Sequence, residues 1–308
     1  MVSATTTSLG PIGFRISATG SGGLDWPRLD ATWALAGEQD VFSAGWLSDH
    51  LSDAGRERGG AAFEAFTTAA ALAHRVPGKW IGLAVAASTF RHPSVLAKQA
   101  TMLDIITGGR FILGLGAGWH VGEHEAFGIA LPPPRERFDR FESALGVVTA
   151  LFSEAARQPP GVTMDDPIYS LDRATNEPAP ITPVGPPIWL GGQRRRGIDL
   201  IGRYASGWPL PGNRAGDVAY FTEKRDLIRR ALESAGRDPR EFTFAAQADC
   251  GADIITRRAA LGVARQMRRA GADHVILGIP GAAAPDTLLA MAREVAEPLK
   301  EPSETTNF

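Results

Sequence analysis

Residues 92–128 constrain the fold more than any other part of this 308-residue chain. Pro93 suits the first turn of a helix, and apolar residues then recur at helical spacing. Gly108 and Gly109 follow, and glycine accepts the left-handed conformation in which many helices end. The apolar run at 111–115 is too short for a helix and lacks alternation, as expected of a parallel strand buried on both faces. The stretch therefore predicts one helix–strand step of an α/β barrel.

The predicted strand ends in a glycine-rich turn that is a candidate binding site. Gly116, Ala117 and Gly118 form this exit, and another molecule can approach a glycine backbone closely. Barrel enzymes react at the C-terminal ends of their strands. These three residues are therefore candidate cofactor contacts, although a tight turn alone would also explain the glycines. Trp119 comes next and either packs in the core or walls a ring-binding pocket.

The rest of the chain continues the same alternation. Strand character is found at 12–16, 41–47, 80–86, 111–115, 188–190, 207–210, 242–248 and 274–279. Helical character is found at 29–37, 64–75, 93–106, 138–151, 198–205, 220–235, 259–269 and 287–299. Eight strands alternating with eight helices, without a break in composition, predict a single-domain (β/α)8 TIM barrel over residues 1–308. Residues 153–187 are rich in Pro, Asp and Thr and predict an irregular insertion between strands four and five.

Composition excludes several classes of protein. The net charge of −2 gives no general attraction to nucleic acid. The single cysteine, Cys250, cannot form an internal disulfide and fits a reducing compartment. The N-terminus has neither a basic region nor an apolar run, and no apolar stretch is long enough to cross a bilayer. We therefore expect a cytoplasmic protein that binds a small molecule and neither nucleic acid nor membrane.

The second predicted strand ends in the pair Asp49-His50. Histidine is the side chain best able to exchange a proton near neutral pH, so His50 is a candidate catalytic residue. A loop histidine without a role is the alternative. The adjacent Asp49 is a candidate cofactor contact, and its carboxylate either orients the histidine or faces solvent.

One long motif in the chain resembles a known family. The sequence HPSVLAKQATMLDIITGGRFILGLGAGW, followed by Glu123 and by Phe127-Gly128, resembles the central motif of the luciferase-like family. That family comprises flavin-dependent monooxygenases and oxidoreductases that use a deazaflavin, coenzyme F420. The resemblance implies a flavin-type ring at the C-terminal mouth of the barrel and hydride transfer between the deazaflavin and a small organic substrate. An FMN-dependent monooxygenase on the same barrel is the alternative, and a homodimer is compatible with the family.

The resemblance also assigns roles to residues near the predicted strand ends. It places His50 against the reactive face of the ring as proton donor, proton acceptor or polar substrate contact. The pair Asp49-His50 favours the deazaflavin, because the flavin monooxygenases often carry Glu-His-His there. Trp119 stands where some sugar-phosphate dehydrogenases of the family have a catalytic glutamate, which argues against that reaction. Glu123 is either a carboxylate that supports the site or an acid that stabilises a helix N-terminus. The predicted catalytic residues are thus His50, Trp119 and Glu123.

Two further strand ends are predicted to line the cofactor. Gly191, Gly192 and Gln193 follow strand five, where two glycines at a helix N-terminus can expose N–H groups to an anion. The basic run at 194–196 is either part of that anion site or a solvated turn. In related enzymes strand three carries a non-proline cis peptide behind the ring, and the resemblance places that bond between Ala84 and Val85.

Two functions from other classes remain as alternatives. The run His120-Val121-Gly122-Glu123-His124 matches the H-x-x-E-H pattern of zinc proteases, so a metal hydrolase is one of them. The glycine inside this run and the glycine-rich turn before it argue against a metal site, and we predict none. The other alternative is a barrel that binds the cofactor without catalysis.

Overall fold

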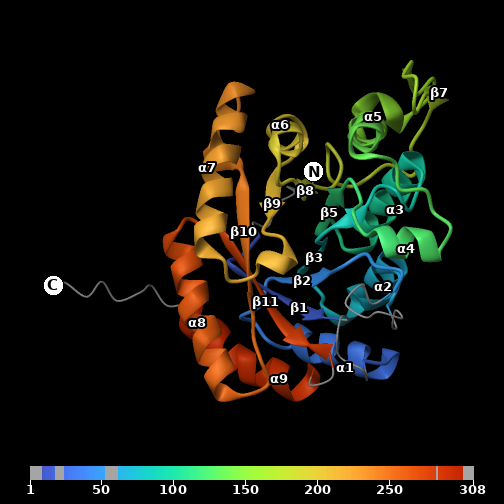
Figure 1. The fold of residues 1–308 in the computed structure, drawn as a ribbon. Helices are drawn as coiled ribbons and strands as arrows, with labels where there is room; N and C mark the ends of the chain where they lie inside the picture. The colour runs from blue at the N-terminus through green and yellow to red at the C-terminus, as the bar shows by residue number, and fades with distance from the viewer. Residues whose placement is uncertain (1–8, 18–23, 53–61, 282–283, 301–308) are drawn as a thin grey trace.

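The computed structural model describes residues 9–17, 24–52, 62–281 and 284–300, and a closed ring of parallel strands lies at their centre (Figure 1). The strands are β1 (Ile12–Ser17), β2 (Ala44–Leu47), β3 (Trp80–Leu83), β4 (Ala86–Ala87), β5 (Phe111–Gly116), β8 (Ile188–Leu190), β9 (Gly207–Pro209), β10 (Thr243–Asp249) and β11 (His274–Pro280). They pair in the order β3-β2-β1-β11-β10-β9-β8-β5-β4, and the pairing of β3 with β5 closes the ring. The predicted TIM barrel is confirmed.

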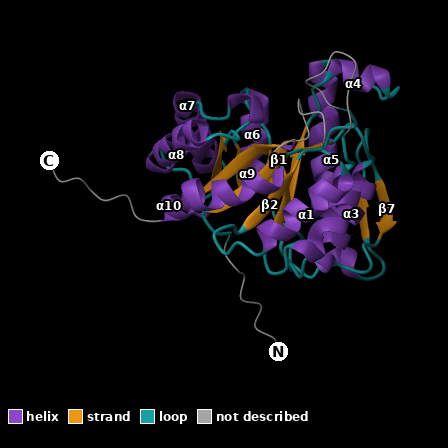
Figure 2. Ribbon diagram, turned by 90° about the horizontal axis from the view of Figure 1, so that it is seen from below, coloured by secondary structure: helices purple, strands orange, loops and turns teal. Residues whose placement is uncertain are grey.

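Helices surround this ring on the outside (Figures 1 and 2). They are α1 (Trp26–Gly37), α2 (Ala65–Leu72), α3 (Pro93–Ile106), α4 (Val121–Ala126), α5 (Pro134–Phe152), α6 (Arg195–Tyr204), α7 (Val218–Ser234), α8 (Ile254–Arg269), α9 (Ala284–Met291) and α10 (Glu297–Lys300). Their apolar faces pack on the strands, as where Trp33 of α1 meets Phe14 of β1 with ring centroids 5.0 Å apart. Within the described residues, every helix falls short of the length and apolar character that a membrane crossing requires.

Tryptophan side chains fill the inside of the barrel. Trp46 and Trp189 lie with their ring centroids 4.9 Å apart, in a buried cluster drawn from six different strands. Glycines on facing strands leave the space that these rings need. A Cβ atom on Gly82 would lie 2.3 Å from the Trp46 ring, and one on Gly207 would lie 2.4 Å from Trp189. The interior is therefore a packed core, and any ligand site lies above it, at the ends of the strands.

The structure differs from the sequence prediction in four places. The third strand, predicted at 80–86, is divided into β3 and β4 by the two residues between them. The insertion at 153–187 is not wholly irregular, because β6 (Val162–Met164) and β7 (Leu171–Ala174) pair as an antiparallel hairpin within it. The two strands are three and four residues long and too short to show alternation, so the sequence pattern did not predict them. The short helix α4 is additional to the predicted eight. The closing helix predicted at 287–299 is divided into α9 and α10 by a π-helical turn at Ala292–Ala296.

Candidate active site

His50 and Glu123 form a direct contact at the mouth of the barrel. His50 follows β2, and Glu123 lies in the first turn of α4, after β5. Oε2 of Glu123 lies 3.1 Å from Nδ1 of His50. The other carboxylate oxygen of Glu123 accepts hydrogen bonds from the backbone N–H groups of Leu51 and Ser52. Glu123 is 2% exposed, whereas the His50 side chain is 22% exposed. A buried carboxylate therefore orients a partly open imidazole and leaves its Nε2 atom for other partners.

Asp49 has a different function from its neighbour. Its carboxylate accepts hydrogen bonds from Nη1 of Arg91 at 2.7 Å and from Nη2 of Arg91 at 2.9 Å. It also accepts one from the N–H of Ala87, in β4. Asp49 therefore neither orients His50 nor faces solvent. It fastens the end of β2 to the exit of the third strand.

Arg91 extends this anchor to the next helix. It also donates to Glu64, which caps the N-terminus of α2 through the N–H groups of Phe66 and Thr67. Burial opposes ionisation of Glu64, but the hydrogen bonds from Thr67, Arg91 and Phe66 outweigh it, so the pKa of Glu64 is lowered. A network of two carboxylates and one guanidinium thus supports the loop that carries His50.

The peptide bond between Ala84 and Val85 is cis, as the resemblance predicted. The Val85 side chain packs against glycines of two other strand ends. A Cβ atom on Gly116 would lie 2.9 Å from Cγ2 of Val85, and one on Gly191 would lie 3.0 Å from the same atom. These glycines are therefore required to admit Val85, and Ala84, Val85, Gly116 and Gly191 form one small apolar floor at the barrel mouth.

The turn after β5 brings Trp119 beside His50. Gly118 has a φ of +81°, which favours glycine, and the half-buried Ala117 precedes it. Trp119 is 67% exposed and lies edge-on to the His50 ring, with centroids 6.2 Å apart. Of the two interpretations of Trp119, the structure excludes a core position and leaves that of a wall beside the site.

Gly192 and Gln193 have partners within the protein. Gly192 is buried, and a Cβ atom there would lie 2.8 Å from the backbone of Gly197 in α6. The close packing of α6 on the strand end therefore explains this glycine without a ligand. Gln193 is exposed and accepts a hydrogen bond from the hydroxyl of Tyr220. In the adjacent basic run, Arg196 is paired with Asp139 at 2.7 Å.

The two histidines of the HVGEH run have structural partners. Nδ1 of His120 accepts the N–H of Glu123 and caps α4. His124 is buried, with Nε2 2.8 Å from the Thr89 hydroxyl and Nδ1 2.8 Å from the carbonyl oxygen of His120. In the part of the chain that the structure describes, no three His, Cys, Asp or Glu side chains are grouped as a metal site would need. These contacts give the metal hydrolase no support.

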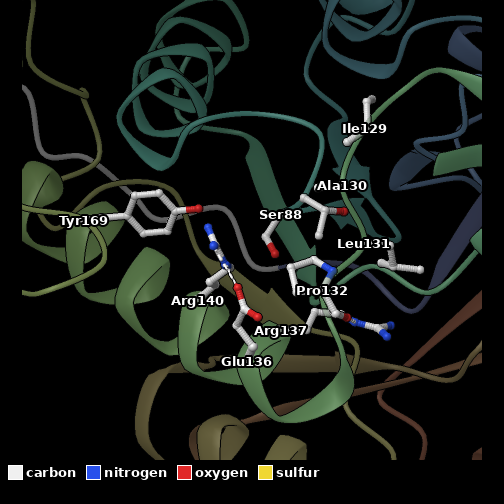
Figure 3. A pocket seen from close by; sticks show the side chains of 10 residues that line it. Ser88, Ile129, Ala130, Leu131, Pro132, Glu136, Arg137, Arg140 and Tyr169 are labelled. Atoms are coloured by element: carbon white, nitrogen blue, oxygen red, sulfur yellow. Dashed lines mark hydrogen bonds and ion pairs between the residues drawn. The ribbon is translucent and has the colours of Figure 1, made fainter. Parts of the chain in front are cut away.

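Two cavities adjoin these residues. A recess of about 30 Å³ lies beside His50 and is lined mainly by apolar side chains, including Ile16, Leu47 and Phe63. A larger cavity of about 350 Å³ lies between the exit of β4 and the start of α5 (Figure 3). Sequence reasoning missed its polar lining, formed by Ser88, Thr89, Glu136, Arg137, Arg140 and Tyr169. No motif marks these residues, and the charged ones resemble the ordinary polar face of an amphipathic helix.

The arrangement can hold a planar ring and exchange a proton beside it. The floor is small and apolar, and His50 with Trp119 stands at its edge. The histidine is held in position by a buried carboxyl group 3.1 Å from its Nδ1 atom. Similar pairs of imidazole and carboxylate serve as general acid–base groups in many enzymes.

The sequence matches a known protein family over most of its length. A model of the luciferase-like monooxygenases matches residues 14–300. A phthiodiolone/phenolphthiodiolone dimycocerosates ketoreductase of Mycobacterium bovis is 30% identical over 223 residues, which cover 72% of this chain and 55% of that protein. An F420-dependent glucose-6-phosphate dehydrogenase of Kineococcus radiotolerans is 29% identical, over 68% of this chain and 60% of that protein. The chain thus spans little more than half the length of these curated relatives.

Solved structures share the fold at low sequence identity. An F420-dependent secondary alcohol dehydrogenase in complex with an F420–acetone adduct superposes with a TM-score of 0.75 at 16% identity, covering 96% of this chain and 100% of that one. A monooxygenase from Streptomyces bottropensis gives a TM-score of 0.75 at 18% identity, covering 93% of this chain and 99% of that one. At this identity the likeness establishes the barrel fold alone.

Proposed function

Because the chain belongs to the luciferase-like monooxygenase family, we propose that it is an oxidoreductase that transfers a hydride between coenzyme F420 and a small organic carbonyl compound. The observation that carries this proposal is the contact between His50 and the buried Glu123 at the edge of the apolar floor. Two similar proteins favour the deazaflavin. The glucose-6-phosphate dehydrogenase is named as F420-dependent, and the solved secondary alcohol dehydrogenase is a complex with an F420–acetone adduct. A cytoplasmic homodimer built from one domain per chain remains part of the proposal.

The residues present fit a deazaflavin ring. Ala84, Val85 and Ala117 are half-buried and offer a small apolar surface without a charged group. Trp119 supplies an exposed aromatic wall, and His50 supplies a polar edge. When bound, the reduced deazaflavin supplies the hydride. Asp49 and Arg91 contribute indirectly, because they fix the strand ends on which the floor and the histidine stand.

The proton is assigned to His50. Its Nδ1 atom faces Glu123, so Nε2 is the atom that exchanges a proton with the substrate oxygen. Reduction of a carbonyl adds one hydride to carbon and one proton to oxygen, and protonated His50 delivers the latter.

Turnover tests this proposal with the intact protein. Reduced coenzyme F420 is mixed with a panel of ketones and aldehydes, and oxidation of the cofactor is followed by absorbance. We expect turnover by the wild type, and a loss of about 10²–10⁴-fold in kcat for His50→Ala with unchanged thermal unfolding, because general acid–base residues contribute that much. His74→Ala, on an exposed histidine in the turn after α2, is the control and should retain activity.

The result also separates the alternative functions. Unchanged kcat in His50→Ala would reject the catalytic role. Turnover with reduced FMN and oxygen, but not with coenzyme F420, would favour the FMN-dependent monooxygenase. Cofactor binding without turnover of any acceptor would favour a protein that only binds.

A further inference from the structure

The cavity beside the start of α5 is lined by two arginines and one glutamate. Arg137 donates to the carbonyl oxygens of Pro132 at 3.0 Å and Gly118 at 2.9 Å, so its positive charge faces backbone dipoles. Arg140 pairs with Glu136 at 2.8 Å, one helical turn away. These three side chains carry one net positive charge into a cavity of about 350 Å³.

Hydroxyl groups converge on the same space. Figure 3 shows the hydroxyl of Tyr169 beside the guanidinium of Arg140 and the hydroxyl of Ser88 pointing inward from the opposite wall. Thr89 also lines the cavity, but its hydroxyl lies 2.8 Å from Nε2 of His124 and is already hydrogen-bonded. Guanidinium groups combined with hydroxyls provide the donors that recognise phosphate and carboxylate groups.

The wall that carries Tyr169 is held in place by the insertion. Asp166 accepts hydrogen bonds from the N–H groups of Ile168 and Tyr169 and from the hydroxyl of Ser143 in α5. The bond from Ser143, reinforced by the two backbone donors, lowers the pKa of Asp166. The His92 ring packs edge-on against Tyr169, with centroids 5.2 Å apart. Since both neighbours fix Tyr169, the cavity is formed before any ligand enters.

The cavity lies beside the turn at Gly118, two residues after Gly116 of the apolar floor. Arg137, which lines the cavity, donates to the Gly118 carbonyl oxygen at 2.9 Å. A Cβ atom on Gly118 would lie 2.5 Å from the hydroxyl of Thr89, which also lines the cavity. The cavity and the floor are therefore neighbours, which is the arrangement that a ligand with a ring and an anionic arm would require.

We infer that this cavity binds the oxyanion of a phosphate ester. The inference rests on the proposed function where the ester is the phosphodiester arm of coenzyme F420, and a phosphorylated substrate is the other source of the same chemistry. In either case Arg137 and Arg140 provide the positive charge, the hydroxyls provide further donors, and Glu136 opposes binding. Removing the charge of Arg140 should therefore lower the affinity for the ester, whereas removing the charge of Glu136 should raise it.

Calorimetric titration of the intact protein at constant low ionic strength tests the inference. The probes are coenzyme F420, the corresponding deazariboflavin without the phosphodiester arm, and inorganic phosphate. Loss of a charged donor should weaken binding of coenzyme F420 by about tenfold in Arg140→Gln, while the deazariboflavin binds unchanged. Glu136→Gln should strengthen binding of coenzyme F420. Arg135→Gln is the control, because this exposed arginine lies outside the cavity lining. FMN and riboflavin give the same comparison for the flavin alternative.

Each outcome decides the assignment. If only inorganic phosphate binding responds to Arg140→Gln and Glu136→Gln, the cavity binds an oxyanion that does not belong to the cofactor. If neither ring compound binds but phosphate binding still responds, the proposed function fails and the oxyanion site stands. If phosphate does not bind and the affinity for coenzyme F420 is the same in all variants, the inference is overturned.

Discussion

At the scale of single residues, the candidate site depends on a contact between side chains 73 positions apart in sequence. Sequence reasoning identified His50 and Glu123 separately, because each follows a predicted strand. It could not pair them, since β2 and β5 are separated by β3 in the sheet and their exits meet only when the barrel closes. Arg91 was missed for a similar reason, as its partners Asp49 and Glu64 lie on two other segments.

Glu123→Gln tests whether the buried acid positions His50. The amide can still accept the hydrogen bonds of the Leu51 and Ser52 backbone, but it no longer carries the charge that stabilises protonated His50. We expect kcat to fall to a value between those of the wild type and His50→Ala, with an unchanged Kd for the cofactor. Stopped-flow turnover and a binding titration give the two constants. A fall in affinity with unchanged kcat would instead indicate a role in the binding site.

At the scale of helices and strands, the sequence predicted which elements exist better than where they begin. Asp25, Asp217 and Asp253 cap α1, α7 and α8 through side-chain hydrogen bonds. These helices begin two to five residues before the predicted starts at 29, 220 and 259. The apolar periodicity locates the buried face of a helix, and that face begins about one turn after the cap. The strand at 80–86 was predicted as continuous because side-chain pattern carries no information on a divided strand.

Gly192→Ala tests the packing of α6 on β8. The added Cβ atom would lie 2.8 Å from the backbone of Gly197, which cannot move without shifting the helix. We expect a loss of about 1–3 kcal/mol in the free energy of unfolding, as for other overpacked sites. The control is Gly262→Ala in α8, where a Cβ atom meets nothing within 4 Å and should stabilise the helix by about 0.5–1 kcal/mol. Urea denaturation measures both. A Gly192→Ala variant as stable as the wild type would contradict the packing role.

At the scale of the whole molecule, the barrel interior contains one buried histidine. Nδ1 of His274 donates to the Gly10 carbonyl oxygen, and its Nε2 atom accepts the indole N–H of Trp46 at 3.0 Å. Burial lowers the pKa of His274 to about 4, so the imidazole is neutral in the folded protein. The barrel as a whole was predictable from alternation, but this polar contact was not. It joins His274 of β11 to Trp46 of β2 and to Gly10 before β1, which are far apart in the sequence.

This histidine makes the stability of the barrel depend on pH. Between about pH 4 and pH 6.5 the unfolded chain binds a proton that folded His274 does not. The free energy of unfolding therefore falls as the pH drops through this window, by roughly 3 kcal/mol in total for a shift of this size. His274→Gln keeps a donor and an acceptor, and should give a smaller decrease in Tm between neutral and acidic buffer. Equal decreases in the two proteins would show that other groups cause the dependence.

The central claim is that the barrel mouth binds a deazaflavin. The most direct test is a calorimetric titration of the intact wild-type protein with coenzyme F420 and, in parallel, with FMN. The account predicts one molecule of coenzyme F420 bound per chain and weaker binding of FMN, because the apolar floor, His50 and the cavity together suit a deazaflavin with its anionic arm. Tighter binding of FMN would contradict the deazaflavin assignment. Binding of neither compound would contradict the cofactor site itself.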